Sequence, residues 1–207
     1  MGAIKLFNQE IYQKKLDVDH LYPDRRKQPL PLILTPKEIQ QLLEKIRNLK
    51  HKTIITCIYS AGLRISEVIQ LQLKEVDYNR MVLLIKGGSK RKPREVMLSN
   101  KLKVLLQQYH RAYHPQQWLF EGPQGKPYST TSIQKIFKKA SKKAQLNPKA
   151  TVQTLRHSFA THFLEQGGDL LTLQQLLGHQ SIKTTRIYKQ LAVVPQAVVQ
   201  SPLDGWD

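Results

Sequence analysis

The sequence predicts a mainly α-helical domain that carries one small antiparallel β-sheet, an α+β fold. Apolar residues recur at helical spacing along most of the chain, and one pair of short β-prone segments flanks a Gly-rich turn. The length of 207 residues suits one domain with short extensions. Because 40% of the residues are hydrophobic, the chain can bury a core of its own.

The helical pattern begins after residue 33. Thr35–Glu38 (TPKE) has the form of a capping box with proline at the first helical position. The next apolar residues follow at the i, i+3, i+4, i+7 spacing of an amphipathic helix: Ile39, Leu42, Leu43 and Ile46. Further helices are predicted at about residues 53–61, 65–73, 101–112, 130–145, 153–166, 170–177 and 182–190.

The predicted β-region lies near the middle of the chain. Met81–Ile85 is a β-prone apolar run, Lys86–Pro93 is a basic, Gly-containing turn, and Arg94–Leu98 is a second short strand. Together these segments predict an antiparallel hairpin. By contrast, residues 1–32 show only weak helical periodicity and end in a basic, proline-punctuated stretch that is typical of a linker.

The charge balance points to a polyanionic partner. The chain has 33 Lys and Arg against 15 Asp and Glu, a formal net charge of +18. On a folded chain this small, the excess of positive charge favours a protein whose partner is nucleic acid. The alternative is a generic basic protein such as a ribosomal component. The single cysteine, Cys57, excludes an internal disulfide framework. No apolar run approaches the roughly 20 residues of a membrane span and no signal peptide opens the chain, so we expect a cytoplasmic protein without a membrane partner.

The segment 130–145 predicts the most strongly charged helix. Its apolar face is expected to carry Ile133, Ile136, Phe137, Ala140 and Ala144. The opposite face carries lysines: Lys135, Lys138, Lys139, Lys142 and Lys143. Such a helix can lie in a major groove and take its affinity from the phosphates. A solvated lysine face is the alternative, and the net charge favours phosphate contact.

Several short motifs place polar residues where their apolar neighbours predict burial. Gly62–Glu67 (GLRISE) sets an arginine just after a helix-ending glycine, and Leu155–His162 (LRHSFATH) sets another at the edge of an apolar stripe. A buried guanidinium needs an anion, which either Glu67 or a ligand phosphate can supply. Leu177–His179 (LGH) and Thr184–Tyr188 (TTRIY) follow. Each motif taken alone is typical of ordinary core or capping chemistry.

Taken together and in this order, the motifs resemble the catalytic domain of the tyrosine recombinases, the phage, integron and chromosome-dimer-resolving integrases. The match runs from about residue 33 to 195 and includes a gap of nine residues between His179 and Tyr188. The resemblance implies cleavage of a DNA phosphodiester through a 3′-phosphotyrosyl intermediate, with no metal or other cofactor. It also implies that Tyr188 is the nucleophile and that Arg64 and Arg156 bind the scissile phosphate.

Further site residues follow from the same resemblance. His179 matches the histidine that orients the tyrosine and the phosphate, and Glu67 matches an acidic supporting position. Lys86 matches the lysine that protonates the departing 5′-oxygen. Other basic residues of the same turn compete for that role or contact the DNA: Lys90, Arg91 and Lys92.

One position departs from the family pattern. A histidine usually stands three residues before the second arginine, where this chain has Gln153. Glutamine can donate a hydrogen bond to a phosphate oxygen but cannot accept and return a proton at neutral pH. Three interpretations stay open: a natural variant, a weakened enzyme, and an introduced substitution.

The resemblance divides the chain into three parts. Residues 1–32 match the end of a truncated N-terminal DNA-binding domain plus a basic linker, residues 33–192 the catalytic domain, and residues 193–207 a C-terminal tail. The tail is expected to dock on a neighbouring subunit, with packing on its own domain as the alternative. The implied partner is double-stranded DNA, bound by a homotetramer that is expected to be monomeric without DNA. A prokaryotic, nucleoid-associated location is implied with it.

The leading functional hypothesis is site-specific DNA recombination or integration by strand exchange between two duplexes. A type IB topoisomerase-like nicking-closing enzyme, which uses the same residues without pairing two duplexes, is the first alternative. A DNA-binding module with impaired catalysis is the second, and Gln153 together with the missing N-terminal part suggests it.

Overall fold

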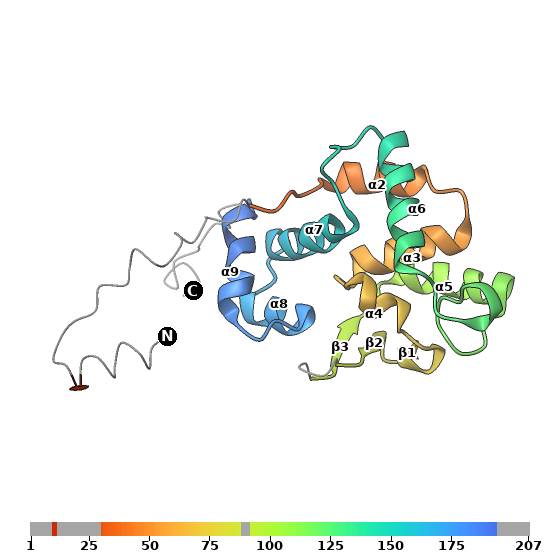
Figure 1. The fold of residues 1–207 in the computed structure, drawn as a ribbon, viewed down its shortest axis with the longest axis horizontal. Coiled ribbons are helices and arrows are strands. Elements are labelled where there is room, and N and C mark those ends of the chain that lie inside the picture. Colours follow the sequence, from red (N-terminus) through yellow and green to blue (C-terminus); the bar gives the residue numbers. More distant parts are fainter. Residues whose placement is uncertain (1–9, 12–29, 88–91, 194–207) are drawn as a thin grey trace, which may run out of the picture. The chain divides into compact units, whose positions relative to one another are not determined.

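The computed structural model of the chain describes residues 10–11, 30–87 and 92–193 (Figure 1). The chain divides into two units, residues 1–30 and 31–207, and the fold below is that of the second. Most of the predicted linker, Lys90 and Arg91 of the basic turn, and the tail from residue 194 lie outside the described residues.

Helices dominate the second unit, as the sequence predicts. They are α2 (Pro36–Glu44), α3 (Leu49–Ser60), α4 (Ile65–Ile69), α5 (Asn100–Tyr113), α6 (Thr130–Lys143), α7 (Val152–Glu165), α8 (Leu170–Leu177) and α9 (Ile182–Leu191), with 3₁₀ turns at Leu73–Glu75 and Pro123–Gly125. The capping box at Thr35 is present, with the Thr35 hydroxyl accepting from the Glu38 N–H and the Glu38 carboxylate accepting from the Thr35 N–H.

Two predicted helix boundaries are wrong for identifiable reasons. α3 begins at Leu49 rather than residue 53, because the Asn48 side chain caps the helix by accepting from the His51 N–H at 3.0 Å. The helix predicted to reach residue 73 stops at Ile69. Beyond that point the backbone pairs with a distant segment, since Leu73 N–H donates to Gln117 C=O at 3.2 Å.

A three-stranded antiparallel sheet, in the order β1-β2-β3, lies at one end of the domain (Figure 1). It consists of β1 (Val76–Asp77), β2 (Val82–Ile85) and β3 (Arg94–Met97), and β2 and β3 form the predicted hairpin. β1 escaped prediction because two residues are too few to show a period of two. The register places Arg94 opposite Ile85, so the first residue of β3 stands at the turn end of the hairpin.

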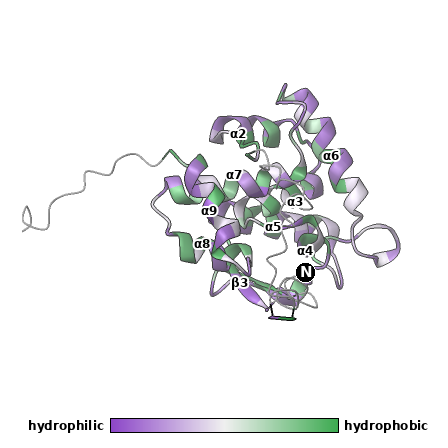
Figure 2. Cartoon of the chain, turned by 60° about the vertical axis from the view of Figure 1, so that its left-hand side comes forward, coloured by the Kyte–Doolittle hydropathy of each residue, from purple (hydrophilic) through white to green (hydrophobic). Residues whose placement is uncertain are grey.

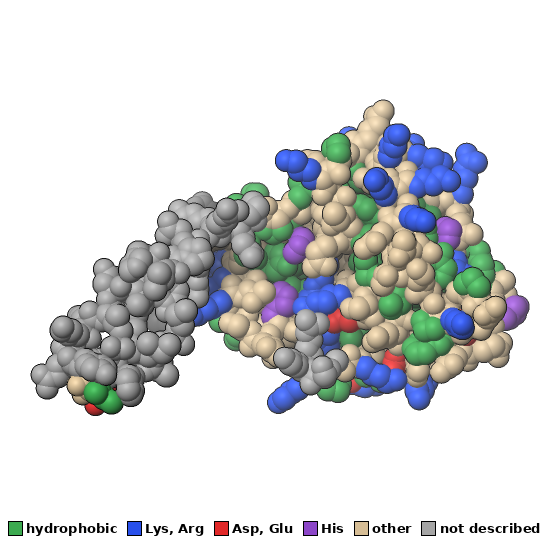
Figure 3. Space-filling view, viewed as in Figure 1, with side chains coloured by type: hydrophobic (Ala, Val, Ile, Leu, Met, Phe, Trp, Pro, Cys, Tyr) green, Lys and Arg blue, Asp and Glu red, His purple; other side chains and the backbone are tan. Residues whose placement is uncertain are grey.

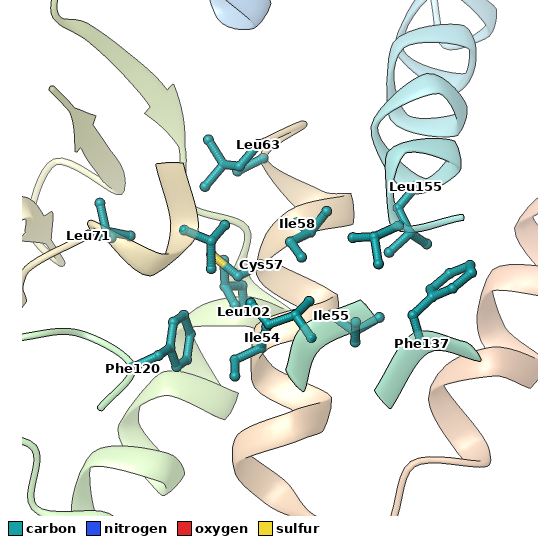
Figure 4. Packing of buried hydrophobic residues seen from close by; sticks show 14 of the residues in the cluster. Ile54, Ile55, Cys57, Ile58, Leu63, Leu71, Leu102, Phe120, Phe137 and Leu155 are labelled. Atoms are coloured by element: carbon teal, nitrogen blue, oxygen red, sulfur yellow. The ribbon is translucent and has the colours of Figure 1, made fainter. Parts of the chain in front are cut away.

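The main core surrounds α3, which packs against α2, α4, α5, α6 and α7. Figure 4 shows Ile55 and Ile58 of α3 on the side of Phe137 of α6 and Leu155 of α7, and Ile54 on the side of Phe120. All three isoleucines are 1% exposed or less. A fully buried side chain of this size stabilises a fold by about 1.5–3 kcal/mol. The core therefore fixes α4 and α7, which carry the two motif arginines, relative to one another.

A second hydrophobic cluster joins α7, α8 and α9 and includes Phe159, Leu173, Leu177 and Tyr188. The chain turns from α3 toward α4 at Gly62, which has a φ of +59° and lies against Phe159 and Leu177 of this cluster. A Cβ at this position would lie 2.3 Å from Cδ1 of Phe159, so the turn requires glycine for both its conformation and its close approach. Arg64 is thereby held beside α7.

Helix α6 is amphipathic as predicted. Ile133, Phe137 and Ala140 are buried, whereas all five predicted lysines are exposed. Figure 2 shows the contrast between the mostly hydrophilic ribbon of α6 and the hydrophobic ribbon of α8. None of the helices in the described residues is long and apolar enough to cross a membrane.

Candidate active site

Arg64 begins the site at the N-terminus of α4. Its backbone N–H donates to Oε2 of Glu67 at 2.9 Å, and its Nη1 donates to Oε1 of the same carboxylate at 3.1 Å. Nη1 also donates to the Leu177 carbonyl at 3.3 Å, which ties α4 to the end of α8. The sequence left Glu67 and a ligand phosphate as alternative partners of Arg64, and the structure shows Glu67 in that place.

Arg156 lies deeper, with its side chain 1% exposed. Nη1 donates to the Gly62 carbonyl at 2.8 Å, and Nη2 donates to the Leu177 carbonyl and to Nε2 of His179, the latter at 3.3 Å. Its Nη1 is 3.6 Å from the Glu67 carboxylate. Arg156 thus joins the turn before α4 to the turn after α8.

Arg94, which the sequence marked only as the start of a strand, completes the cluster. Nη1 and Nη2 donate to the two oxygens of Glu67 at 3.0 and 2.9 Å, and Nε donates to the Leu176 carbonyl at 2.7 Å. Forked pairing of this kind gives both charge and geometry. No local pattern predicts this contact, because Glu67 of α4 and Arg94 of β3 are 27 residues apart in the sequence and come together only when the chain folds.

The cluster keeps Glu67 ionised. Burial alone would raise the pKa of the Glu67 carboxyl, but hydrogen bonds from Arg94 and the Arg64 backbone, with the charges of Arg94 and Arg156, hold it below its ordinary value. Burial is the main cause that lowers the pKa of Arg156, and the positive charge of Arg64 lowers it further. The negative charge of Glu67 acts in the opposite direction and raises this pKa. Three guanidiniums share this one carboxylate, so the cluster keeps a net positive charge that suits an anion.

Tyr188 of α9 lies beside the arginines and is 3% exposed. Its hydroxyl is 2.8 Å from Nδ1 of His157, and its ring is nearly parallel to that of His179, with centroids 6.4 Å apart. Burial raises the pKa of the Tyr188 phenol, although the charges of Arg156 and Arg64 oppose the shift. The phenol is therefore neutral at pH 7 and needs a proton acceptor in order to react as a nucleophile.

His179 follows the left-handed Gly178 that ends α8. Its Nδ1 is 3.0 Å from Oγ1 of Thr185, and its Nε2 faces Nη2 of Arg156. The structure therefore brings together the predicted residues Arg64, Glu67, Arg156, His179 and Tyr188. His157, which stands in the quoted LRHSFATH motif without an assigned role, is the further residue found there. The signal in the sequence was its place directly after Arg156.

Gln153 lies one turn before Arg156, at the exposed start of α7. It lines a cavity of about 770 Å³ together with Arg64 of α4 and Lys138 of α6. Hydrogen-bond donors from three helices thus converge on one open space beside the arginine cluster. A phosphate in this space would meet the Arg64 guanidinium and the Gln153 amide.

The structure places Lys86 away from the arginine cluster. Its Nζ is 2.7 Å from Oε1 of Glu75 and 3.3 Å from Oε1 of Gln72. Lys92, a competing residue of the same turn, instead lines a cavity of about 750 Å³ with Arg94 and His179. Lys90 and Arg91 lie outside the described residues.

The exposed lysines of α6 form part of a wider basic surface. Lys135, Lys139 and Lys143 line a cavity of about 390 Å³ with Lys45 and Arg47 from the segment between α2 and α3. Figure 3 shows lysine and arginine side chains gathered over this end of the domain. In the described part of the chain, no three His, Cys, Asp or Glu side chains form a group that could hold a metal ion.

Comparison with known proteins gives a consistent assignment. The chain matches the phage integrase family over residues 33–193. It is 41% identical over 181 residues to the y4qK protein of Sinorhizobium fredii, provisionally named an integrase/recombinase, and 36% identical over 176 residues to the tyrosine recombinase XerD of Staphylococcus saprophyticus. These matches cover 87% and 79% of this chain but only 59% of each relative.

A solved structure agrees with this result. The XerH site-specific recombinase, bound to palindromic difH substrate in a post-cleavage complex, matches with a TM-score of 0.75 at 27% identity. The match covers 83% of this chain and 53% of that one. The predicted fold class and the predicted resemblance to the tyrosine recombinases are confirmed. The chain belongs to the phage integrase family.

Proposed function

We propose that this chain is the catalytic domain of a tyrosine recombinase that recombines or integrates DNA at specific sites. The observation that carries the proposal is the meeting of four side chains: Arg64, Arg156, His179 and Tyr188. Arg156 contacts His179, both arginines contact Glu67, and the charges of both arginines act on the Tyr188 phenol. The names of the relatives support the same activity.

In the proposed reaction the Tyr188 oxygen attacks the phosphorus of a DNA phosphodiester in line with the 5′-oxygen. The products are a 3′-phosphotyrosyl bond and a free 5′-hydroxyl, and attack by another 5′-hydroxyl reverses the step without ATP. Negative charge that grows on the non-bridging oxygens is stabilised by the guanidiniums. The Arg64 side chain is 21% exposed and that of Arg156 only 1%, so the phosphate meets Arg64 first.

The departing 5′-oxygen needs a proton, which we assign to a cation of the turn between β2 and β3. The family resemblance selects Lys86. The Lys86 side chain is 61% exposed, whereas that of its partner Glu75 is only 6% exposed. Lys86 must therefore leave a buried carboxylate to reach the 5′-oxygen, and the negative charge of the DNA phosphates is proposed to offset that cost. Lys92 stays the alternative, because it lines the same cavity as His179.

The lysines of α6 are proposed to hold the duplex by its phosphates, together with Lys90 and Arg91. We further propose that a homotetramer pairs two duplexes, in a prokaryotic cytoplasm. The division into residues 1–32, 33–192 and 193–207, with a tail that docks in trans, belongs to the same proposal.

The test is covalent capture of DNA. A library of nicked duplexes with randomised arms is incubated with the chain, so that cleavage near the nick releases a short fragment and traps the protein on the DNA. The proposal expects a covalent adduct that survives denaturation, and sequencing of the trapped DNA gives the target site. Absence of any adduct from this chain and from its Gln153→His variant would remove the enzymatic proposal in favour of a DNA-binding module.

Gln153 supports that second candidate. Its amide lines the same cavity as Arg64 but cannot exchange a proton at neutral pH. A module with impaired catalysis would bind the selected duplex and leave its phosphodiesters intact.

A further inference from the structure

Helix α7 carries a histidine that touches the reacting atom of the proposed nucleophile. Nδ1 of His157 lies 2.8 Å from the Tyr188 hydroxyl oxygen, and the two rings lie with centroids 5.8 Å apart. We infer that His157 is a catalytic residue, which takes the Tyr188 proton during cleavage and returns it during religation. The inference rests on the proposed function and adds to it the identity of the proton acceptor.

His179, the histidine that the family resemblance selects, is held in the wrong orientation to accept this proton. Its Nε2 faces Nη2 of Arg156, and a guanidinium can only donate, so Nε2 is the acceptor in that contact. Its Nδ1 then carries the ring proton and donates to Thr185 Oγ1. Both nitrogens of His179 are thereby engaged with groups other than the phenol.

Gln153 cannot take the proton either. It replaces the histidine of the family pattern, and its amide neither accepts nor releases a proton at neutral pH. A neutral phenol that attacks phosphorus must still lose its proton to some base. Among the described residues, the imidazole already within hydrogen-bond distance of that phenol is His157.

The surroundings keep the His157 ring neutral before the reaction. Tyr188 from α9 faces the ring, and Arg156 is its charged neighbour on α7. Burial, and then the charge of Arg156, lowers the pKa of His157 below its ordinary value, while burial raises the pKa of Tyr188. A neutral imidazole that accepts at Nδ1 carries its proton on Nε2, and it meets a phenol that still has a proton to give.

The step balances in protons and bonds. The Tyr188 oxygen forms a bond to phosphorus while its proton passes to Nδ1, which leaves an imidazolium at His157. The bond between phosphorus and the 5′-oxygen breaks, and that oxygen takes its proton from the cation of the turn between β2 and β3. In religation the imidazolium returns its proton to Tyr188 as the tyrosine leaves phosphorus.

The same helix provides a matched control. His162 also faces a tyrosine hydroxyl through Nδ1, at 2.9 Å from Tyr59, and burial lowers its pKa as well. His157→Asn keeps a hydrogen-bonding group at the Nδ1 position but removes the base, and His162→Asn makes the same change in the other pair. The rate of covalent adduct formation is measured for both variants and for the unaltered chain, in single turnover across a range of pH. The substrate is the nicked duplex whose sequence was identified in the covalent capture experiment above.

The inference predicts that His157→Asn forms adduct about 10²- to 10⁴-fold more slowly, the usual contribution of a positioned base, with unchanged affinity for the duplex. Adduct formation by the unaltered chain and by His162→Asn should slow as the pH falls, because protonated His157 cannot accept, and His157→Asn should lack this acid limb. A His157→Asn protein that is as fast as the unaltered chain, or slower with the acid limb intact, would overturn the inference. Absence of adduct from both the unaltered chain and its Gln153→His variant would instead contradict the proposed function.

A measurement on the unaltered chain without DNA covers the case in which a variant does not fold. In ¹⁵N nuclear magnetic resonance of the histidine rings, the inference predicts the tautomer of His157 with bare Nδ1 and protonated Nε2, and a changed titration of that ring in Tyr188→Phe. A protonated Nδ1 at neutral pH, or a titration indifferent to Tyr188, would show that His157 only donates to the phenol and would contradict its role as the base.

Discussion

A single carboxylate, that of Glu67, holds three guanidiniums in place around the proposed phosphate site. We predict that Glu67→Gln lowers the free energy of unfolding by about 3–5 kcal/mol, because it leaves buried arginine charge without its partner. Urea denaturation measures this directly. Since the folded state holds the pKa of Glu67 below its ordinary 4.5, the loss should be full above that pH and should shrink as the pH falls through the folded-state pKa.

The control for this prediction is another forked arginine–glutamate pair. Arg80 donates to both oxygens of Glu95 at 2.9 and 2.8 Å, but these side chains are 60% and 44% exposed. Glu95→Gln should therefore change stability much less than Glu67→Gln. Equal losses in the two variants would contradict the view that burial makes the Glu67 cluster important.

Gln153 offers a second prediction at the scale of one residue. Gln153→His should raise the rate of adduct formation by up to about 10²-fold, the lower end of what a positioned acid–base group contributes. The reason is that an imidazole in the cavity beside Arg64 can both donate to a phosphate oxygen and exchange a proton. The rate is measured as covalent adduct formation on the selected nicked duplex in single turnover. A rate for Gln153→His that is equal to or slower than that of the unaltered chain would contradict the hypothesis.

At the scale of one helix, α6 should supply salt-sensitive affinity rather than chemistry. Replacing Lys139 and Lys143 by glutamine should weaken DNA binding and reduce the slope of log affinity against log salt by about 0.9 for each lost phosphate contact. Titrations at several salt concentrations measure this slope. Replacing Lys101 and Lys103 of α5, which do not line the cavity beside α6, serves as the comparison, and an equal change of slope in both pairs would contradict the assignment.

The helices were predictable because their signals are local. Apolar spacing and the capping box at Thr35 identify α2, and the same kind of spacing identifies α6 with its lysine face. β1 was not predictable because its two residues are too few to show a period, although its partner β2 follows closely. The true end of α4 was not predictable because the backbone beyond it pairs with the distant segment around Gln117. Tertiary contacts decide such short elements, and local propensity does not.

The site was predictable only in part, for a similar reason. Ordered motifs identified Arg64, Arg156, His179 and Tyr188, which the fold then brings together. Arg94 could not be assigned, because its contact with Glu67 crosses from a strand to a helix. The position of Lys86 beside Glu75 depends on how the sheet meets the 3₁₀ turn, which no motif encodes.

At the scale of the whole molecule, recombination requires more than cleavage of one duplex. We predict that two differently labelled duplexes that carry the selected site are joined to one another by this protein. Supercoiled DNA that is relaxed without any joined product would favour a type IB topoisomerase-like enzyme, which uses the same chemistry on one duplex. Gel separation of the labelled products distinguishes these two outcomes.

The central claim is that Tyr188 is the nucleophile among the eight tyrosines of the chain. Covalent adduct on the nicked duplex is digested with protease, and mass spectrometry identifies the peptide that carries the nucleotide. The account predicts the phosphodiester on Tyr188, and a Tyr188→Phe protein that binds the duplex without forming adduct. A nucleotide attached to any other residue, or an adduct that persists in Tyr188→Phe, would contradict it.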